Sequence, residues 1–225
     1  MAIVPTQDII RMDTRTKRMT KKEQRDASVE KLLSVAESLF IANGFHATTM
    51  EEIASSAGLT KGAVYFYFGD KQSVLLRLLE KVEATVMRPL IELVELGTGD
   101  PLQRVDAFLV HQAKLAQLTP SMLLLPIIVS IEFAGTGELP ETRVKYGYRR
   151  TARALKKAIE DGQASGVFRT DVTAENQASI MLALNDGAML EWLRRDLKDG
   201  GRELVKSLRK IILAGLVAKN AETKS

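Results

Sequence analysis

The sequence contains no cysteine among its 225 residues and few aromatic side chains. Without cysteine there are no disulfides, thiolate zinc sites, iron–sulfur clusters or cysteine nucleophiles, which fits a cytoplasmic protein. The longest apolar run, 122–131, is broken by Pro126 and Ser130 and falls short of the ~18 residues of a membrane helix. The N-terminus lacks the apolar core of a signal peptide. We therefore expect no membrane partner.

Sequence motifs for catalysis are also missing. His46 and His111 stand far apart, and neither lies in a spacing typical of metal ligands. There is no G-x-S-x-G, Walker or G-x-G-x-x-G motif. The neighbouring carboxylates of Glu51 and Glu52 would point about 100° apart on a helix and so do not converge. We expect no enzymatic activity, no cofactor and no metal.

Charge is nearly balanced, with a formal net charge of +4. A net charge of this size does not by itself indicate a nucleic-acid partner. Basic residues are concentrated in 11–25, ahead of the first apolar segment. We interpret residues 1–20 as a flexible basic arm because they are poor in apolar side chains. Contact of this arm with phosphates or a minor groove is the alternative interpretation.

Apolar residues recur at helical spacing along most of the chain. In the first helix they are followed by Gly44, a typical helix end, and preceded by Thr20 and Glu23, which have the spacing of a capping box. Prolines at 101 and 120 are placed to begin two further helices. No alternation is long enough to indicate a strand. The sequence predicts an all-α fold of about nine helices, divided into residues 21–70 and 71–225.

Two short helices joined at 57–59 have the spacing of a helix-turn-helix. Thr60, Lys61, Gly62 and Ala63 begin the second helix with small and basic side chains, which suits entry into a major groove. Tyr65 and Tyr67 supply hydroxyl donors for phosphates. Lys71 lies in the first turn of the following helix, where a cation is best explained by a nearby anion.

These residues also carry a resemblance. The stretches 48–54, 58–68 and 70–71, together with the 36–45 segment of the first helix, resemble the TetR family of bacterial transcriptional repressors. The resemblance covers residues 28–78 and implies a phosphate contact for Thr49 and a packing role for Phe66 and Phe68. It also implies that Tyr65 reaches a thymine methyl group. The complete set of implied DNA contacts is Thr49, Thr60, Lys61, Gly62, Ala63, Tyr65, Tyr67 and Lys71.

Residues 173–195 form a helix that is apolar on more than one face, which indicates burial on both sides. One stripe contains Ile180, Leu184 and Gly187. The resemblance supplies a partner for it, because in this family the last two helices of each subunit form a four-helix dimer bundle. We therefore expect a homodimer through residues 173–218.

The second stripe of that helix suggests a pocket for a small, largely apolar effector, because methionine adapts to varied ligands. The candidate ligand-binding residues are Phe108, His111, Met122, Phe133, Tyr146, Met181, Asn185, Met189 and Trp192. Binding there must act on DNA affinity through two arrangements of the DNA-binding parts. We expect the helix at 71–87 to be the lever between them.

The preferred function is therefore a ligand-responsive DNA-binding regulator, a repressor released from a palindromic double-stranded operator. One alternative is a helical small-molecule-binding protein or enzyme in which the helix-turn-helix is incidental. Another is a nonspecific architectural DNA-binding protein. Dependence of binding on a palindrome distinguishes the first function from both.

Overall fold

The computed structural model describes residues 20–97, 99–195 and 201–218. Within them, α4, η1 and α5 follow one another without a break, so the described residues form nine helical rods, as the sequence predicts. The elements are α1 (Lys21–Asn43), α2 (Met50–Ala57), α3 (Lys61–Phe68), α4 (Lys71–Val82), the π-helical turn η1 (Glu83–Met87), α5 (Arg88–Glu95), α6 (Pro101–Leu118), α7 (Pro120–Glu132), α8 (Leu139–Ala164), α9 (Ala174–Arg194) and α10 (Gly201–Leu216).

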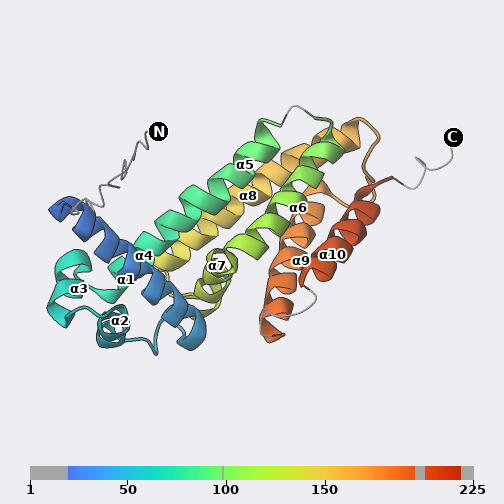
Figure 1. The fold of residues 1–225 in the computed structure, drawn as a ribbon. Helices are drawn as coiled ribbons and strands as arrows, with labels where there is room; N and C mark the ends of the chain where they lie inside the picture. The colour runs from blue at the N-terminus through green and yellow to red at the C-terminus, as the bar shows by residue number, and fades with distance from the viewer. Residues whose placement is uncertain (1–19, 98, 196–200, 219–225) are drawn as a thin grey trace, which may run out of the picture.

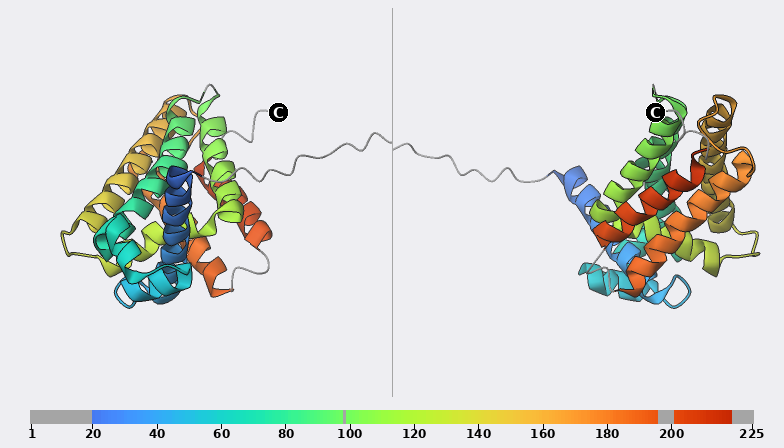
Figure 2. Two further views of the ribbon diagram at one scale, coloured as in Figure 1. Left: turned by 60° about the vertical axis from the view of Figure 1, so that its left-hand side comes forward. Right: turned by 90° about the vertical axis from the view of Figure 1, so that its right-hand side faces the viewer.

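The described molecule is elongated, with α1, α2 and α3 gathered at one end (Figure 1). The rods α4–α5 and α8 run along its length, and α9 and α10 lie side by side at the other end (Figures 1 and 2). The basic arm expected over 1–20 lies outside the described residues except for Thr20. The α1–α3 segment, expected to bind DNA, and the α9–α10 pair, expected to form the dimer, thus lie at opposite ends.

Helix ends at the α1–α3 end follow the local sequence closely. The side chain of Thr20 accepts the Glu23 N–H, and Glu23 accepts the Thr20 N–H in return. Thr49 and Glu52 form the same capping box at the start of α2. Gly58 ends α2 at φ 67°, a left-handed conformation that favours glycine. Each of these features depends on residues within four positions of one another.

The rod at 71–95 is longer than the 71–87 helix that the sequence predicts. It continues through η1 into α5, and the Arg88 N–H bonds to the Glu83 carbonyl five residues back. Pro89 has no N–H and would clash with the carbonyl four residues earlier in a regular helix. The wider π turn immediately before Pro89 takes up this misfit, so the proline does not end the rod.

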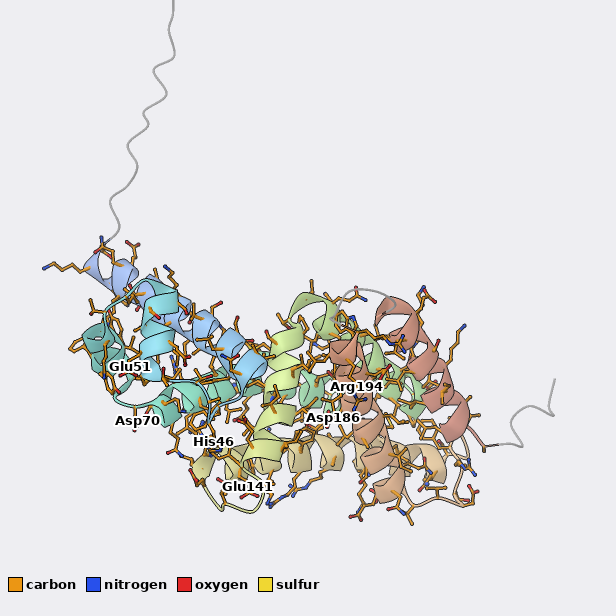
Figure 3. All side chains as sticks on the ribbon, turned by 90° about the horizontal axis from the view of Figure 1, so that it is seen from below. His46, Glu51, Asp70, Glu141, Asp186 and Arg194 are labelled. Atoms are coloured by element: carbon orange, nitrogen blue, oxygen red, sulfur yellow. The ribbon has the colours of Figure 1, made fainter. Side chains whose placement is uncertain are left out.

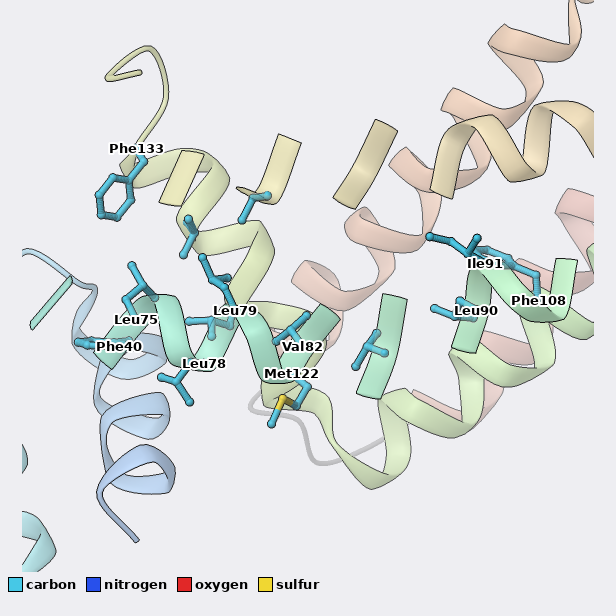
Figure 4. Packing of buried hydrophobic residues seen from close by; sticks show 14 of the residues in the cluster. Phe40, Leu75, Leu78, Leu79, Val82, Leu90, Ile91, Phe108, Met122 and Phe133 are labelled. Carbon is cyan, nitrogen blue, oxygen red and sulfur yellow. The ribbon is translucent and has the colours of Figure 1, made fainter. Parts of the chain in front are cut away.

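The hydrophobic core is continuous from one end of the molecule to the other. Figure 4 shows Phe40 of α1 against Leu75 and Leu78 of α4, and further along the same core Phe108 beside Ile91. A division into residues 21–70 and 71–225 remains a proposal, because the packing crosses it through α4. Buried residues of the rod from Val74 to Val94 therefore pack in the same core as both ends of the molecule.

No single helix in the described residues is long and apolar enough to span a membrane. The segments α6 and α7 meet that test only together, and the chain bends by 100° between them. Pro126 lies inside α7, where it removes one backbone hydrogen bond without ending the helix.

Candidate DNA-reading surface and ligand cavity

The α2–α3 pair presents the start of α3 to solvent. Ile53 of α2 and Val64 of α3 are completely buried and hold the two helices together. Thr60 caps α3 by accepting the Ala63 N–H, so the first turn of α3 is well defined. Figure 3 shows Glu51 and Asp70, which flank α3 in sequence, at this end of the molecule. The surface formed by Thr49, Thr60–Ala63, Tyr65–Tyr67 and Lys71 is called the DNA-reading surface below.

The structure brings the predicted DNA contacts onto that one surface. Thr49, Thr60, Lys61, Gly62 and Tyr65 are exposed, whereas Ala63, Tyr67 and Lys71 are partly buried. Phe68 is partly buried against the core, consistent with its expected packing role. An exposed helix N-terminus with small side chains can approach phosphates and base edges closely.

Phe66 contradicts the prediction that it packs inside. Its side chain is 78% exposed, and its ring contacts the edge of Tyr67 at 5.6 Å between centroids. On the eight-residue helix α3, the buried Val64 defines the inner face, and Phe66 lies two residues on, about 200° away. Phe66 therefore belongs to the DNA-reading surface.

An ion pair that sequence reasoning missed joins the two helices. The ammonium of Lys61 at the start of α3 contacts the carboxylate of Glu51 in the first turn of α2. This contact raises the pKa of Lys61 and lowers the pKa of Glu51. The opposite charges at the N-termini of two helices in a tight pair were the available signal. In the unbound protein, the long side chain expected to reach a base is already partnered.

Lys71 also has partners inside the protein. Its ammonium donates to the carbonyls of Phe45, His46 and Thr48 at 2.6, 3.3 and 2.7 Å. Burial lowers the pKa of Lys71. The sequence argument explained this lysine by a nearby anion. In the structure, three backbone carbonyl oxygens of the α1–α2 loop accept its hydrogen bonds, so a phosphate is not needed to explain a cation here. The phosphate contact itself stays a prediction.

The end of α7 is fastened to the same loop. Glu132 accepts the Phe45 N–H at 2.7 Å, and a side chain at Gly44 would overlap the Glu132 carboxylate. Phe133 lies against Phe45 at 5.1 Å between ring centroids. Phe133 is therefore part of the junction between α7 and the DNA-binding end, and its predicted place in the ligand pocket is wrong.

A cavity lies farther along the molecule, between the α4–η1–α5 rod and helices α6, α7, α8, α9 and α10. Its empty volume is about 920 Å³, part of which is open to solvent. The apolar wall includes Val82, Val86, Met87, Leu90, Leu109, Ala113, Ala116, Met122, Leu123, Pro126, Leu182, Ala188, Met189, Trp192, Leu204, Val205 and Leu208.

Four of the nine predicted ligand residues lie on the cavity wall: Met122, Asn185, Met189 and Trp192. His111 does not, because Leu109, Gln112 and Ala116 define the inward face of α6 and His111 points the other way. Phe108 and Met181 are buried in the main core. Tyr146 is 57% exposed, with Arg150 over its ring, so it is an outer residue of α8.

Polar groups on the cavity wall were mostly missed from the sequence. The Tyr148 hydroxyl donates to the Asp186 carboxylate, and burial raises the pKa of Asp186 to about 6. Gln112 and Trp192 each have a buried polar atom without a partner among the described residues. Asn185 donates to the Met181 carbonyl of its own helix. Tyr148 and Gln112 went unrecognised because only the packing of α6 and α8 on α9 places them together.

No group of three or more His, Cys, Asp or Glu side chains in the part of the chain described here is arranged to hold a metal ion. One surface is exposed and bears a capped helix N-terminus, and the other is a partly open, mainly apolar cavity with a few polar groups.

Comparison with known proteins identifies this combination. Residues 32–78 match the family model for bacterial regulatory proteins of the tetR family. The MbdR regulator from Azoarcus sp. CIB has a crystal structure that superposes with a TM-score of 0.77 at 40% identity, covering 85% of this chain and all of that one.

Two curated relatives are similar over most of their length. The HTH-type transcriptional regulator AcrR of Shigella flexneri is 28% identical over 92% of this chain and 98% of its own. The HTH-type transcriptional repressor NemR of Escherichia coli is 27% identical over 77% of this chain and 87% of its own. The chain belongs to the TetR family and is a DNA-binding transcriptional regulator.

Proposed function

We propose that the chain is a dimeric repressor that leaves a near-palindromic operator in the cytoplasm when a small, largely apolar molecule fills the cavity. The observation that carries this proposal is the rod at 71–95. Its first turns pack in the core beneath the DNA-reading surface, and Val82, Val86, Met87 and Leu90 further along it line the cavity. A molecule in the cavity therefore touches the same helix that supports the DNA-binding end.

The π turn η1 is the natural point of response along that rod. Val86 and Met87 lie within or at the end of it and face the cavity. A π turn and a regular α-helical turn differ in rise and rotation, so a shift between them would displace α4 relative to α5. Differential binding of a ligand to two such arrangements is the thermodynamic requirement for control.

Helix α7 offers a second connection. Met122, Leu123 and Pro126 line the cavity, while Glu132 at its far end accepts the Phe45 N–H of the α1–α2 loop. A ligand that displaces α7 would act on the loop that Lys71 also holds. The two connections converge on the segment that precedes α2, and so on the orientation of the DNA-reading surface.

Dimerisation through α9 and α10 is supported by apolar side chains that nothing in the described protomer covers. Ile180 and Leu184 of α9 and Ile211 of α10 are exposed, and a Cβ at Gly187 would meet no atom within 4 Å. Figure 2 shows α9 and α10 side by side on an outer face. Two copies joined there would present two α3 helices to successive major grooves, about 34–36 Å apart.

Gly187→Asp tests the dimer directly. The position is open within the protomer, so the substitution should leave the fold intact while placing two charges in the interface. We expect a monomer by light scattering and a loss of operator affinity of at least about 100-fold, because one half-site then binds alone. Gly187→Asn, of the same size and uncharged, is the control. A dimeric Gly187→Asp protein with normal affinity contradicts the proposed interface.

The repressor function is tested with DNA that flanks the coding gene. Fluorescence anisotropy should find a near-palindromic site there, and changing the spacing of its half-sites should abolish tight binding. A library of small apolar molecules is then screened for release of this DNA and for a change in the fluorescence of Trp192, the chain's single tryptophan. Compounds that change Trp192 fluorescence without affecting DNA binding would refute the coupling.

A further inference from the structure

The cavity combines apolar walls with polar atoms whose hydrogen-bonding capacity is unused. Trp192 Nε1 and Gln112 Oε1 are both buried and have no partner among the described residues. Leaving such a buried atom unpaired is unfavourable, so a ligand that pairs it binds more tightly. Trp192 offers a donor and Gln112 an acceptor. A ligand that pairs both atoms must therefore carry a hydrogen-bond acceptor near Trp192 and a hydrogen-bond donor near Gln112.

Asp186 is the third polar group of the cavity wall that a ligand can contact. Its carboxylate accepts the hydroxyl of Tyr148, and no described lysine or arginine forms an ion pair with it. Arg209 also lines the cavity, but its guanidinium is bound through two nitrogens to Asp106 at 2.5 and 2.7 Å. Figure 3 shows Asp186 on α9, distant from the DNA-reading surface. An uncompensated carboxylate in apolar surroundings favours a cation and disfavours an anion.

The distance between Asp186 and Trp192 along α9 indicates how long a ligand must be to contact both. Trp192 follows Asp186 by six residues on α9, which at 1.5 Å per residue places the two about 9 Å apart along the helix axis. Gln112 faces them from α6 across the cavity. A molecule that satisfies both ends must therefore be extended, with a positive group and an acceptor separated by an apolar body.

We propose that the cavity selects lipophilic organic cations, with a protonated amine at Asp186, a hydrogen-bond acceptor at Trp192 and an aromatic or aliphatic body between them. This proposal rests on the proposed function for the consequence of binding, but the preference for a cation is a separate property of the cavity. Burial raises the pKa of Asp186 only to about 6, so the carboxylate is charged at pH 7.5. Between pH 5 and 7.5 the other titratable groups on the cavity wall do not change, because Tyr148 stays neutral and Arg209 stays positive.

The test uses three probes of one shape: biphenyl-4-methylammonium, biphenyl-4-methanol and biphenyl-4-carboxylate. Binding to the full-length protein is measured by calorimetry and by Trp192 fluorescence at pH 7.5. We expect the ammonium to bind about tenfold or more tighter than the alcohol, as for a hydrogen bond to a charged group, and the carboxylate to bind most weakly. A 4′-methoxy ammonium probe should gain further affinity that Trp192→Phe removes, as measured by calorimetry.

Asp186→Asn should bring the ammonium and the alcohol to equal affinity. Glu191→Gln is the matched control, because it changes the same charge on the same helix at an exposed carboxylate already paired with Arg194 and Arg195. If Asp186→Asn does not fold, the wild-type protein at pH 5 replaces it. Protonation of Asp186 there should remove the preference while the amine stays charged.

The outcomes separate the two proposals. If the alcohol binds as tightly as the ammonium, or if Asp186→Asn and pH 5 both leave the preference intact, the cation class is overturned. Operator release by any probe would then still support the effector cavity. If no probe binds, the cation preference is overturned as well. Binding of the ammonium without operator release supports the cation class and contradicts the proposed function.

Discussion

The two ends of the molecule differ in how far apart in sequence their functional residues lie. All positions of the DNA-reading surface fall between Thr49 and Lys71, within two short helices and their caps. The cavity draws on residues from Val82 to Arg209, and only packing of several helices brings them together. Local sequence therefore specifies the first site, and tertiary packing creates the second.

The two sites also differ in how their charged side chains are paired and exposed. At the DNA-reading surface, Lys61 and Glu51 neutralise each other in an exposed pair, whose worth in water is small. In the cavity, Asp186 is partly buried and has only a tyrosine hydroxyl as partner. Exposed charges are available for exchange with phosphates, whereas a buried unpaired charge biases which small molecule can enter.

Lys71→Met should have the largest effect. It tests whether internal hydrogen bonds stabilise the DNA-binding end. Removing the ammonium leaves three carbonyls of the α1–α2 loop without their donor. We expect a loss of about 2–3 kcal/mol in the free energy of unfolding, measured by urea denaturation. Lys81→Met, also on α4 but in an exposed pair with Glu30, should cost less than about 1 kcal/mol.

Salt dependence separates the two roles of Lys71. If it also contacts a phosphate, the slope of operator affinity against salt concentration should shrink by about one unit in the Lys71→Met protein. An unchanged slope with reduced stability would assign it to the loop alone. Equal stability of the Lys71→Met and Lys81→Met proteins would contradict the structural role.

Lys61→Ala should have the next largest effect and tests base reading at the DNA end. If Lys61 reads a guanine, affinity for the preferred operator should fall by about 1–3 kcal/mol and less at other sequences. Competition binding over an operator library measures this difference. An equal loss at all sequences would make Lys61 a phosphate contact only, and DNA shape would then carry specificity.

Glu51→Gln is the counterpart of Lys61→Ala. It frees Lys61 and removes a negative charge facing the DNA, so affinity for all sequences should rise. A fall in affinity at selected positions would instead show that Glu51 reads a cytosine amino group.

The contrast between the two ends explains what sequence reasoning achieved. The capping boxes at Thr20 and Thr49, the turn at Gly58 and the all-α fold follow from local patterns, and the structure confirms them. The helix expected at 71–87 ends short of the observed rod, which continues past Pro89 because a π turn accommodates this proline. Phe66 was assigned inward from a family pattern, although its helix face is outward.

The cavity could be predicted only in part for a related reason. Met189 and Trp192 lie on one stripe of α9, which periodicity reveals. Periodicity does not reveal which stripe of α6 or α8 faces the cavity, so Gln112 and Tyr148 were missed. The contact between Asp186 of α9 and Tyr148 of α8 likewise depends on how the two helices pack.

Asp186→Asn should have a smaller, pH-dependent effect on stability that reports on the cavity end. The pKa of Asp186 is about 6 in the folded protein, against the ordinary value of 3.8. Between these values the folded state binds the extra proton, so the free energy of unfolding falls as pH rises through this window. The variant should therefore be more stable than wild type by about 1–2 kcal/mol above pH 6.5, allowing for partial exposure, and equal to it near pH 3.5.

Glu141→Gln provides the opposite case in the same experiment. Hydrogen bonds from Lys145, then from the Gly135 and Gly137 N–H groups, lower the pKa of Glu141 to about 2. Its contribution to stability is present above about pH 4.5 and is lost as pH falls toward 2. Thermal denaturation across pH should show the two variants departing from wild type in opposite directions. The same direction for both would contradict the environment assigned to Asp186.

Tyr67→Phe should have the smallest effect and isolates a neutral contact at the DNA end. The ring is partly buried and has the Arg25 guanidinium 6.0 Å from its centroid, and phenylalanine preserves both features. Stability should therefore be unchanged. Loss of one hydroxyl donor should lower operator affinity by about 0.5–1.5 kcal/mol without altering its salt dependence, because no charge is removed. Tyr65→Phe, at a more exposed ring that lies 5.6 Å from the Lys61 ammonium, is the matched comparison. If neither substitution weakens binding, the two hydroxyls do not contact phosphates and the rings alone form that part of the surface.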